Sequence, residues 1–212
     1  MAKKEIILIR HGETMENIRE VFRGRMDVEL NETGKQQAEL LSSYLGRLNT
    51  DVIYSSPLKR ALQTARIIAR PHHRRVHVLK ELVDFHYGEW EGLTNQQVQA
   101  SYPELYRRWI ENPQLVKMPQ GERLSQVRER MHHAIKKAIK HNRSILVSHR
   151  VPLKVLICTL LNLSNSHFWN IKIDLAGVTT FQYDTGSKRF ILVKHNDISH
   201  LRTIQKKVLA DF

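Results

Sequence analysis

The chain has 212 residues, 41% of them hydrophobic, which is enough for one domain with a sizeable core, and no apolar run reaches the ~18 residues of a membrane span. Cys158 is the sole cysteine, so an internal disulfide is excluded, and no signal-peptide-like stretch precedes the first predicted strand; we therefore expect a cytoplasmic protein. The net charge of +13 suits either a polyanion such as nucleic acid or a small anionic substrate. Because the cations are spread along the chain without interleaved aromatic residues, small-anion chemistry is favoured, although the charge alone does not decide.

Strand patterns alternate with helix patterns along the chain. Strands are predicted at 4–10, 51–56, 76–82 and 144–149, and helices at 33–48, 57–69, 94–112, 121–141 and 152–161. Two further strands, 177–183 and 188–196, form a hairpin around a turn at 184–187. This order predicts a three-layer α/β fold: a mainly parallel sheet with helices on both faces and an antiparallel edge hairpin. Residues 1–212 form a single domain in this prediction, with a helical cap segment at about 94–142 beside the active edge.

Charged side chains stand where the predicted parallel strands end. Arg10 and His11 follow the first strand, Asp84 follows the third, and His149 follows the fourth. Ligands bind at the carboxyl ends of such strands. Two histidines, arginines and a carboxyl group suit phosphoryl transfer. Arginines bind phosphate oxygens, a neutral histidine attacks phosphorus, and a carboxylic acid protonates the leaving oxygen before activating water. No motif for a metal or another cofactor is present, and we expect none.

Four motifs occur in a fixed order: "LIRHGETMEN" with "FRGRMDVELNETGKQQA", then "YSSPLKRALQTA", "GEWEG" and "ILVSH". From about residue 5 to residue 201 the chain resembles the histidine phosphatase superfamily, also called phosphoglycerate mutase-like. The resemblance implies that His11 is the nucleophile and that Arg10 and Arg60 bind phosphate. It also implies that Asn17 lines the phosphate pocket and that His149 is the second histidine, which holds the phosphoryl group.

Two positions depart from the family pattern. Asp84 stands four residues before Gly88, where the family usually has glutamate. The shorter side chain would set its carboxyl group ~1.5 Å further from the leaving oxygen, and a misplacement near 1 Å can cost ~100-fold in rate. Glu81 and Glu89 are nearby but do not occupy the matching position. Arg150 replaces a small residue, and it either binds substrate as a third guanidinium at the pocket mouth or, as is commoner for arginine, points into solvent.

The short stretch between Gly92 and Gly121 lacks the insertion of the family's mutases, which favours hydrolysis over transfer. The chain looks most like the metal-independent phosphoserine phosphatases of the superfamily, and also like its phosphatases for α-ribazole phosphate. The loops 18–30, 83–91 and 112–120 are expected to shape the specificity pocket. We predict a metal-independent phosphatase for small phosphomonoesters, phosphoserine or a related metabolite, with a phosphohistidine intermediate.

Several alternatives remain open at the level of the sequence. The chain could be a catalytically weak partner subunit of a phosphatase complex, a mutase-type phosphotransferase, or a protein that binds polyanions. For partners, the prediction is a small phosphorylated metabolite, without nucleic acid and without a membrane. The strand at 188–196 lies near the sheet edge and carries an apolar face, so we predict a homodimer.

Overall fold

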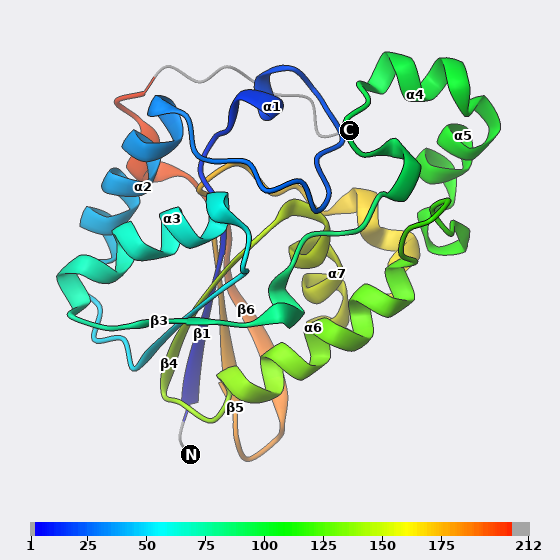
Figure 1. Cartoon of the computed structure of the whole chain (residues 1–212). Coiled ribbons are helices and arrows are strands. Elements are labelled where there is room, and N and C mark those ends of the chain that lie inside the picture. Colours follow the sequence, from blue (N-terminus) through cyan, green and yellow to red (C-terminus); the bar gives the residue numbers. More distant parts are fainter. Residues whose placement is uncertain (1–2, 205–212) are drawn as a thin grey trace.

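The computed structural model describes residues 3–204 (Figure 1). In this range the strands are β1 (Lys3–Arg10), β2 (Val52–Ser55), β3 (Val76–Val78), β4 (Arg143–Ser148), β5 (Val178–Asp184) and β6 (Arg189–Asp197). They form one sheet in the order β3-β2-β4-β1-β5-β6. The first four strands pair in parallel, whereas β5 pairs antiparallel with β1, and β6 antiparallel with β5. The predicted mainly parallel sheet with an antiparallel edge hairpin is confirmed.

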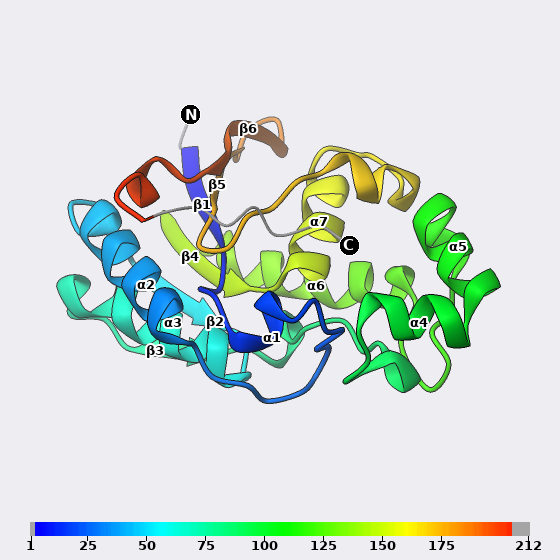
Figure 2. The same cartoon turned by 90° about the horizontal axis from the view of Figure 1, so that it is seen from above.

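Helices cover both faces of this sheet. They are α1 (Met15–Ile18), α2 (Glu32–Leu45), α3 (Lys59–Ala69), α4 (Asn95–Ser101), α5 (Pro103–Glu111), α6 (Leu124–Ala138) and α7 (Arg150–Leu160). Short 3₁₀ turns are η1 (Arg70–His72), η2 (Lys80–Leu82), η3 (Gly88–Trp90), η4 (Pro113–Leu115), η5 (Asn165–Asn170) and η6 (Ser199–Leu201). Seen from above in Figure 2, α2 and α3 lie on one side of the strands, and α6 and α7 on the other. Within residues 3–204, no helix is both long enough and apolar enough to cross a membrane.

The core has two halves because the side chains of a strand alternate between the faces of the sheet. On β1, Ile6 and Leu8 pack in the cluster that includes α6 and α7, while Ile7 and Ile9 pack in the cluster that includes α2 and α3. All four are almost fully buried. A strand covered on both faces needs apolar residues at every position, which explains the unbroken apolar run before Arg10.

Two predicted elements differ from the structure. The third strand ends at Val78 and continues as η2, because β3 is the sheet edge and pairs only with the short β2. The helix predicted at 94–112 is divided into α4 and α5 at Tyr102, whose backbone (φ −135°, ψ 51°) is not helical. Pro103 causes this break, since proline disfavours the helical conformation of the residue before it.

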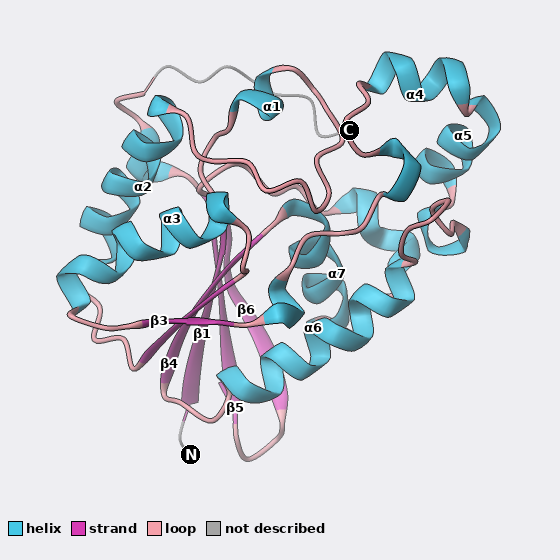
Figure 3. Ribbon diagram, viewed as in Figure 1, coloured by secondary structure: helices cyan, strands magenta, loops and turns pink. Residues whose placement is uncertain are grey.

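The segment predicted as a cap contains helices with different neighbours. Helix α6 packs against α7, β4 and η2, and so belongs to the layer beside the sheet. Helices α4 and α5 pack against each other and continue into η4. In Figure 3 the loops gather at the end of the sheet where β1 finishes, opposite the labelled N-terminus. That end is where the predicted site residues lie.

Candidate active site

The two candidate catalytic histidines follow neighbouring strands. In the pairing of β1 with β4, Arg10 lies opposite Ser148, and the His11 backbone N–H donates to the Ser148 carbonyl oxygen at 3.1 Å. His11 and His149 therefore leave the sheet side by side, with ring centroids 5.1 Å apart. Both are buried, at 1% and 0% exposure. The sheet brings together these two residues, which are 138 positions apart in the sequence.

The His11 ring is held in one tautomer. Its Nδ1 lies 2.6 Å from the Gly12 carbonyl oxygen, and because a carbonyl can only accept, Nδ1 carries the proton and Nε2 keeps its lone pair. Burial, followed by the charge of Arg60 and the neighbouring His149, holds the pKa of His11 well below its usual value. The ring is therefore neutral at physiological pH. This is the form that a nucleophilic histidine requires.

Gly12 allows the N-terminal end of α2 to approach the turn after His11. A Cβ atom on Gly12 would lie 2.5 Å from the Gly34 carbonyl oxygen, which is closer than real Cβ contacts allow. The Gly12 N–H also donates to the Thr64 hydroxyl of α3 at 3.1 Å. The glycine after the histidine is thus required by packing, and it fixes the turn that orients the His11 ring.

His149 lies at the N-cap position of α7 and contacts Ser56, the residue that follows β2. Its Nε2 is 2.7 Å from the Ser56 hydroxyl. Its Nδ1 has no hydrogen-bond partner among residues 3–204 and lies 3.7 Å from Asp84 Oδ2. Burial and then the charge of Arg60 lower the pKa of His149 strongly, so this ring is also neutral. A buried ring nitrogen without a partner calls for an explanation, and a ligand in the site would supply one.

Arg60 is the best-anchored cation of the site. It is fully buried; its Nη1 donates to the Met26 carbonyl oxygen at 2.7 Å and its Nη2 to the Gly24 carbonyl oxygen at 2.8 Å. The same Nη2 lies 2.9 Å from Asp84 Oδ2. Arg10 is also buried, and its Nη1 donates to the Ile173 carbonyl oxygen at 2.6 Å. These contacts fix the guanidinium groups of Arg10 and Arg60, whose charges act on both histidine rings.

Asp84 reaches the site in spite of its shorter side chain. Besides its ion pair with Arg60, its Oδ1 accepts a 2.8 Å hydrogen bond from the Phe85 backbone N–H. The two other candidate acids are engaged elsewhere. Glu81 pairs with Lys137 of α6 at 2.7 Å, and the exposed Glu89 accepts a hydrogen bond from the Tyr102 hydroxyl. Of these three carboxyl groups, Asp84 is the one that forms an ion pair with Arg60 beside the histidines.

Arg130 holds the backbone that presents Asp84. From α6, its Nη1 donates to the carbonyl oxygens of Glu81 and Val83 at 2.7 and 2.6 Å, and its Nη2 donates to that of Asp84 at 3.1 Å. Its charge is balanced by Glu122 at 3.2 Å. The sequence does not identify this residue, because no local pattern connects an arginine on a helix with a loop 46 positions earlier.

Asn17 and Arg150 are both placed near the active edge. Asn17 is buried in α1, where its Oδ1 accepts from the backbone N–H and the hydroxyl of Thr14 at 3.0 Å, so it does act as part of a helix cap. The amide nitrogen of Asn17 is not used by that cap. Arg150, the first residue of α7, is half-buried and does not extend freely into solvent. Burial raises the pKa of Tyr87, and the charge of Arg150 acts in the opposite direction.

Arg23 is a further cation at the site that the sequence analysis did not single out, although it lies in the predicted specificity loop 18–30. It is half-buried, and its charged neighbours are Arg10, Arg60, Arg150 and Asp84. Burial and then the charges of Arg10 and Arg60 lower the pKa of Arg23 to about 9. The site thus collects more positive charge than the two arginines of the motifs provide.

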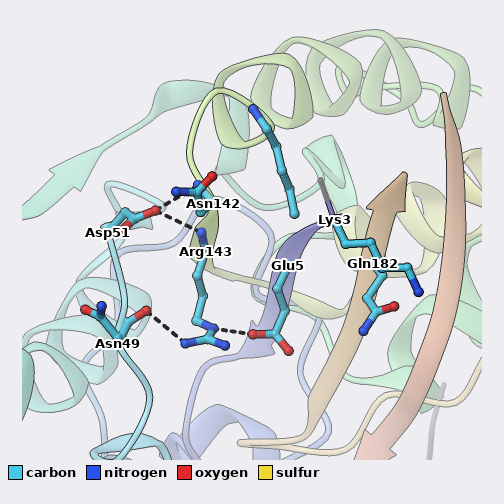
Figure 4. A pocket seen from close by; sticks show the side chains of 8 residues that line it. Lys3, Glu5, Asn49, Asp51, Asn142, Arg143 and Gln182 are labelled. Atoms are coloured by element: carbon cyan, nitrogen blue, oxygen red, sulfur yellow. Dashed lines mark hydrogen bonds and ion pairs between the residues drawn. The ribbon is translucent and has the colours of Figure 1, made fainter. Parts of the chain in front are cut away.

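A separate pocket lies at the opposite end of the sheet, where β1 and β4 begin (Figure 4). It has a cavity volume of about 320 Å³. Arg143 pairs there with Glu5 and donates to the Asn49 carbonyl oxygen, and Asp51 accepts from the backbone N–H of Asn142. We therefore assign this pocket a structural role.

In the part of the chain that the structure describes, no three His, Cys, Asp or Glu side chains are grouped as a metal site.

Comparisons with known proteins agree with this geometry. The model of the histidine phosphatase superfamily (branch 1) matches residues 6–197. Phosphoserine phosphatase 1 of Hydrogenobacter thermophilus is 36% identical over 202 residues, which cover 93% of this chain and 94% of the relative. YhfR of Bacillus stearothermophilus is similar in structure, with a TM-score of 0.88 and 28% identity over 93% of this chain and 99% of that chain. The mycobacterial glucosyl-3-phosphoglycerate phosphatase is also similar in structure, with a TM-score of 0.85 and 26% identity over 92% of this chain and 99% of that chain.

The match of the family model spans the sheet from β1 to β6 and includes both strand ends that carry the histidines. The similar solved structures cover 92% and 93% of this chain, so the predicted fold class is confirmed. At the level of the family, the predicted activity of a phosphoric monoester hydrolase is confirmed as well. This chain belongs to the histidine phosphatase superfamily.

Proposed function

We propose that the chain is a metal-independent phosphatase that hydrolyses small phosphomonoesters, phosphoserine or a related metabolite, through a phosphohistidine on His11. The observation that carries the proposal is the state of the His11 ring, which is buried and neutral and keeps the lone pair of Nε2 among Arg10, Arg60 and His149. The two arginines supply positive charge for the phosphate oxygens, so the reaction has a source of charge stabilisation within the chain.

In the first step, His11 Nε2 attacks phosphorus, the P–N bond forms, and the P–O bond to the substrate breaks. The leaving oxygen takes a proton from Asp84. Asp84 is paired with Arg60 in the free site. An incoming phosphate dianion competes for Arg60 and places negative charge beside Asp84, which favours its protonated form. In the second step the Asp84 carboxylate removes a proton from water, the water oxygen attacks phosphorus, and the P–N bond breaks to release phosphate and neutral His11.

We further propose that His149 donates a hydrogen bond to the phosphoryl group. If the Ser56 hydroxyl donates to Nε2, the neutral ring carries its proton on Nδ1, the nitrogen that faces Asp84. Nδ1–H can then stabilise the charge that builds on the phosphoryl oxygens in the transition state. We further propose that Arg10, Arg60, Asn17 and Arg150 contact the substrate. The contacts of Asn17 and Arg150 support this role less directly than those of the other two.

Rapid-quench labelling with a phosphate-labelled substrate tests the proposal. We expect an acid-labile phosphoenzyme that is lost in His11→Ala and retained in a matched variant of an exposed histidine on α6, His132→Ala. A chelator should leave the turnover intact. Labelling that persists in His11→Ala would remove the proposed nucleophile.

A second candidate function is that of a catalytically weak partner subunit, and the Arg60–Asp84 ion pair favours it. An Asp84 that stays ionised beside Arg60 cannot protonate a leaving group. The purified chain would then hydrolyse an aryl phosphate, whose leaving group needs little protonation, but not phosphoserine. A mutase-type transferase would instead return the phosphoryl group to an acceptor, so that an isomeric phosphomonoester, and not free phosphate, would accumulate.

We also propose a single domain, with α4 and α5 as the part of segment 94–142 that caps the active edge, and a homodimer formed through β6. Strand β6 is the sheet edge of the described residues, and its consecutive residues Ile191, Leu192 and Val193 are 45%, 36% and 54% exposed. Exposed apolar edges tend to be covered. Light scattering should give a dimer mass, and Val193→Lys should give a monomer; a monomer mass for the unmodified chain would contradict the proposal.

The sole, buried Cys158 suits the reducing cytoplasm that we propose as the compartment of this protein.

A further inference from the structure

We infer that Asn196 is a positioning residue of the proposed phosphatase. Through Asp174 it holds residues 171–177, which we name the strap, in the shape that orients Arg10 toward the phosphate group. The inference deepens the proposed function and rests on it, because it concerns how Arg10 is held for the same reaction. Asn196 is on β6, which β5 separates from β1, so it acts on Arg10 through the strap.

The strap joins η5 to β5 and contacts the residues at the end of β1. The Ile173 carbonyl oxygen accepts a 2.6 Å hydrogen bond from Arg10 Nη1. The Gly177 carbonyl oxygen accepts from the Arg10 backbone N–H at 3.3 Å, and the Ala176 N–H donates to the His11 carbonyl oxygen at 3.2 Å. Because the guanidinium group is planar and rigid, a carbonyl bonded to one of its nitrogens sets the direction of its other donors. The shape of the strap therefore determines how Arg10 meets a phosphate.

The strap ends in a turn with an unfavourable backbone conformation. The Gly177 N–H donates to the Asp174 carbonyl oxygen at 3.0 Å, which closes a turn over residues 174–177. Ala176, the third residue of this turn, has φ 54°, a left-handed conformation that is costly for a residue with a Cβ atom and no local polar side chain. Such a conformation persists where the surrounding contacts enforce it.

Asn196 supplies contacts of this kind from β6. Its Oδ1 accepts a 2.8 Å hydrogen bond from the Asp174 backbone N–H, and its Nδ2 donates to Asp174 Oδ2 at 2.9 Å. The amide is also packed closely against the turn, since a Cβ atom on Gly177 would lie 2.5 Å from Asn196 Oδ1. Both polar atoms of the Asn196 side chain thus hold the first residue of the turn, directly after the carbonyl group of Ile173 that binds Arg10.

A β-bulge in β6 directs Asn196 at the strap. The register of β6 against β5 shifts at Thr179, where two residues of β6, His195 and Asn196, lie opposite one residue of β5. Asn196 has φ 49° there, a left-handed conformation that asparagine adopts more readily than most residues, and its N–H donates to the Thr179 hydroxyl at 3.1 Å. A bulge aims a side chain in a direction that a regular strand does not allow.

The experiment measures the binding of inorganic phosphate by calorimetry, which requires no turnover. Asn196→Asp removes the Nδ2 donor and sets two carboxylates against each other. We expect it to raise the dissociation constant of phosphate about tenfold, the size of one hydrogen bond to a charged group, and to raise KM for a phosphomonoester more than it lowers kcat. Asn196→Gly should give the same loss without an added charge, because glycine accepts the left-handed backbone but makes neither side-chain bond.

An exchange of the two side chains tests the bonds themselves. When Asn196→Asp is combined with Asp174→Asn, residue 174 supplies the amide donor and residue 196 the two acceptors, so both bonds form again at an unchanged net charge. The affinity for phosphate should then return close to that of the unmodified chain. In the Arg10→Gln background, Asn196→Asp should cause little further loss, because the two residues act on one contact with phosphate.

Tyr44→Phe is the matched control, since it removes the 2.7 Å hydrogen bond from α2 to Asp197, a bond next to Asn196 that does not involve the strap. It should lower the free energy of unfolding and leave the affinity for phosphate unchanged. Unchanged affinity in Asn196→Asp and Asn196→Gly, no recovery in the exchanged variant, or a full further loss in the Arg10→Gln background would overturn the inference and leave the phosphatase intact. If the affinities change as expected while the unmodified chain forms no phosphoenzyme and hydrolyses no ester, the proposed function fails and the positioning of Arg10 by Asn196 stands.

Discussion

Replacement of Arg130 by glutamine tests how the chain positions its proposed acid. Arg130 is on α6 and makes no bond to the Asp84 carboxyl group, yet it donates to the backbone carbonyl oxygens of Glu81, Val83 and Asp84. If these bonds hold the loop, Arg130→Gln should lower the free energy of unfolding and should also misplace the Asp84 carboxyl group. A side chain without a direct contact to the reacting atoms would then control the protonation of the leaving group.

The expected loss of stability follows from the bonds. Hydrogen bonds to a charged group contribute about 1.5–3 kcal/mol each, and they are not additive where they share one side chain. Glu122 retains Arg25 as an ion-pair partner at 2.9 Å, so the substitution does not leave a buried carboxylate unpaired. The Arg130 side chain is 15% exposed, and water can reach part of the space. We therefore expect a loss of about 3 kcal/mol in urea unfolding, at the lower end of the range for a broken buried pair.

The activity of the variant separates positioning from general destabilisation. A shift of the carboxyl group near 1 Å should cost ~100-fold on an alkyl phosphate, and clearly less on an aryl phosphate. In the D84N background, Arg130→Gln should add little further loss of activity, because the two residues act through one proton transfer. The matched control is Arg128→Gln on the same helix, whose Nη1 donates to the Leu163 backbone carbonyl oxygen at 3.1 Å and, at 3.5 Å, to Asn165 Oδ1. It should cost about 1 kcal/mol and show no dependence on the leaving group.

Equal losses on alkyl and aryl phosphates, together with a full additional loss in the D84N background, would refute the positioning role. Arg130 would then stabilise the fold and nothing more. If Arg130→Gln is as stable as the unmodified chain, the three hydrogen bonds from Arg130 to carbonyl oxygens do not hold the loop in place.

Three further predictions concern the histidines and the acid. Asp84→Asn should cost ~100- to 10,000-fold on an alkyl phosphate and less on an aryl phosphate, whereas Asp84→Glu should retain or raise turnover; near-full turnover of D84N on phosphoserine would exclude Asp84 as the acid. Because burial lowers the pKa of His11 and His149, the unfolded chain takes up protons below pH 6.5 that the folded chain does not. The stability should therefore be complete above pH 6.5 and fall at lower pH by up to about 1.4 kcal/mol per pH unit for each histidine. Urea unfolding at pH 7 and pH 5 measures this, and an unchanged slope in His149→Asn would contradict it. Ser56→Ala, which removes the 2.7 Å contact to His149 Nε2, should lower kcat about tenfold with little change in KM; a change confined to KM would argue against an orienting role.

The central sheet and most of the site could be predicted because the signals are local. The apolar runs before His11 and His149 give the strands, and parallel pairing then brings their ends together. The division of the helix at Tyr102 also had a local signal in Pro103, which the periodic pattern of apolar residues around it concealed.

The contacts of Arg23, Ser56 and Arg130 could not be predicted in the same way. Each depends on the path of a loop or on the distance between elements that meet only in the folded chain. The shorter Asp84 side chain raised a doubt that the sequence could not resolve, since the position of its backbone is set by Arg130 from another element. Hydrophobic periodicity specifies which face of a helix or strand is buried. It does not specify which side chain, distant in the sequence, donates a hydrogen bond to a backbone carbonyl oxygen of a loop.

The pairing of β1 with β4 has a consequence for how this site can change. The spacing between the two histidine rings is set by the register in which Arg10 lies opposite Ser148, and a slip of one residue would turn every side chain of the strand to the other face. Because β1 is apolar on both faces, the core alone does not set this register; a slip would separate Arg10 from Ser148 and His11 from His149, so the spacing is inherited with the strand pairing and not maintained by the loops. The parts of loop 18–30 that make no bond to Arg60 can therefore vary in charge while the two histidines stay fixed. New substrates can be acquired at the rim of this sheet without redesigning the chemistry beneath it.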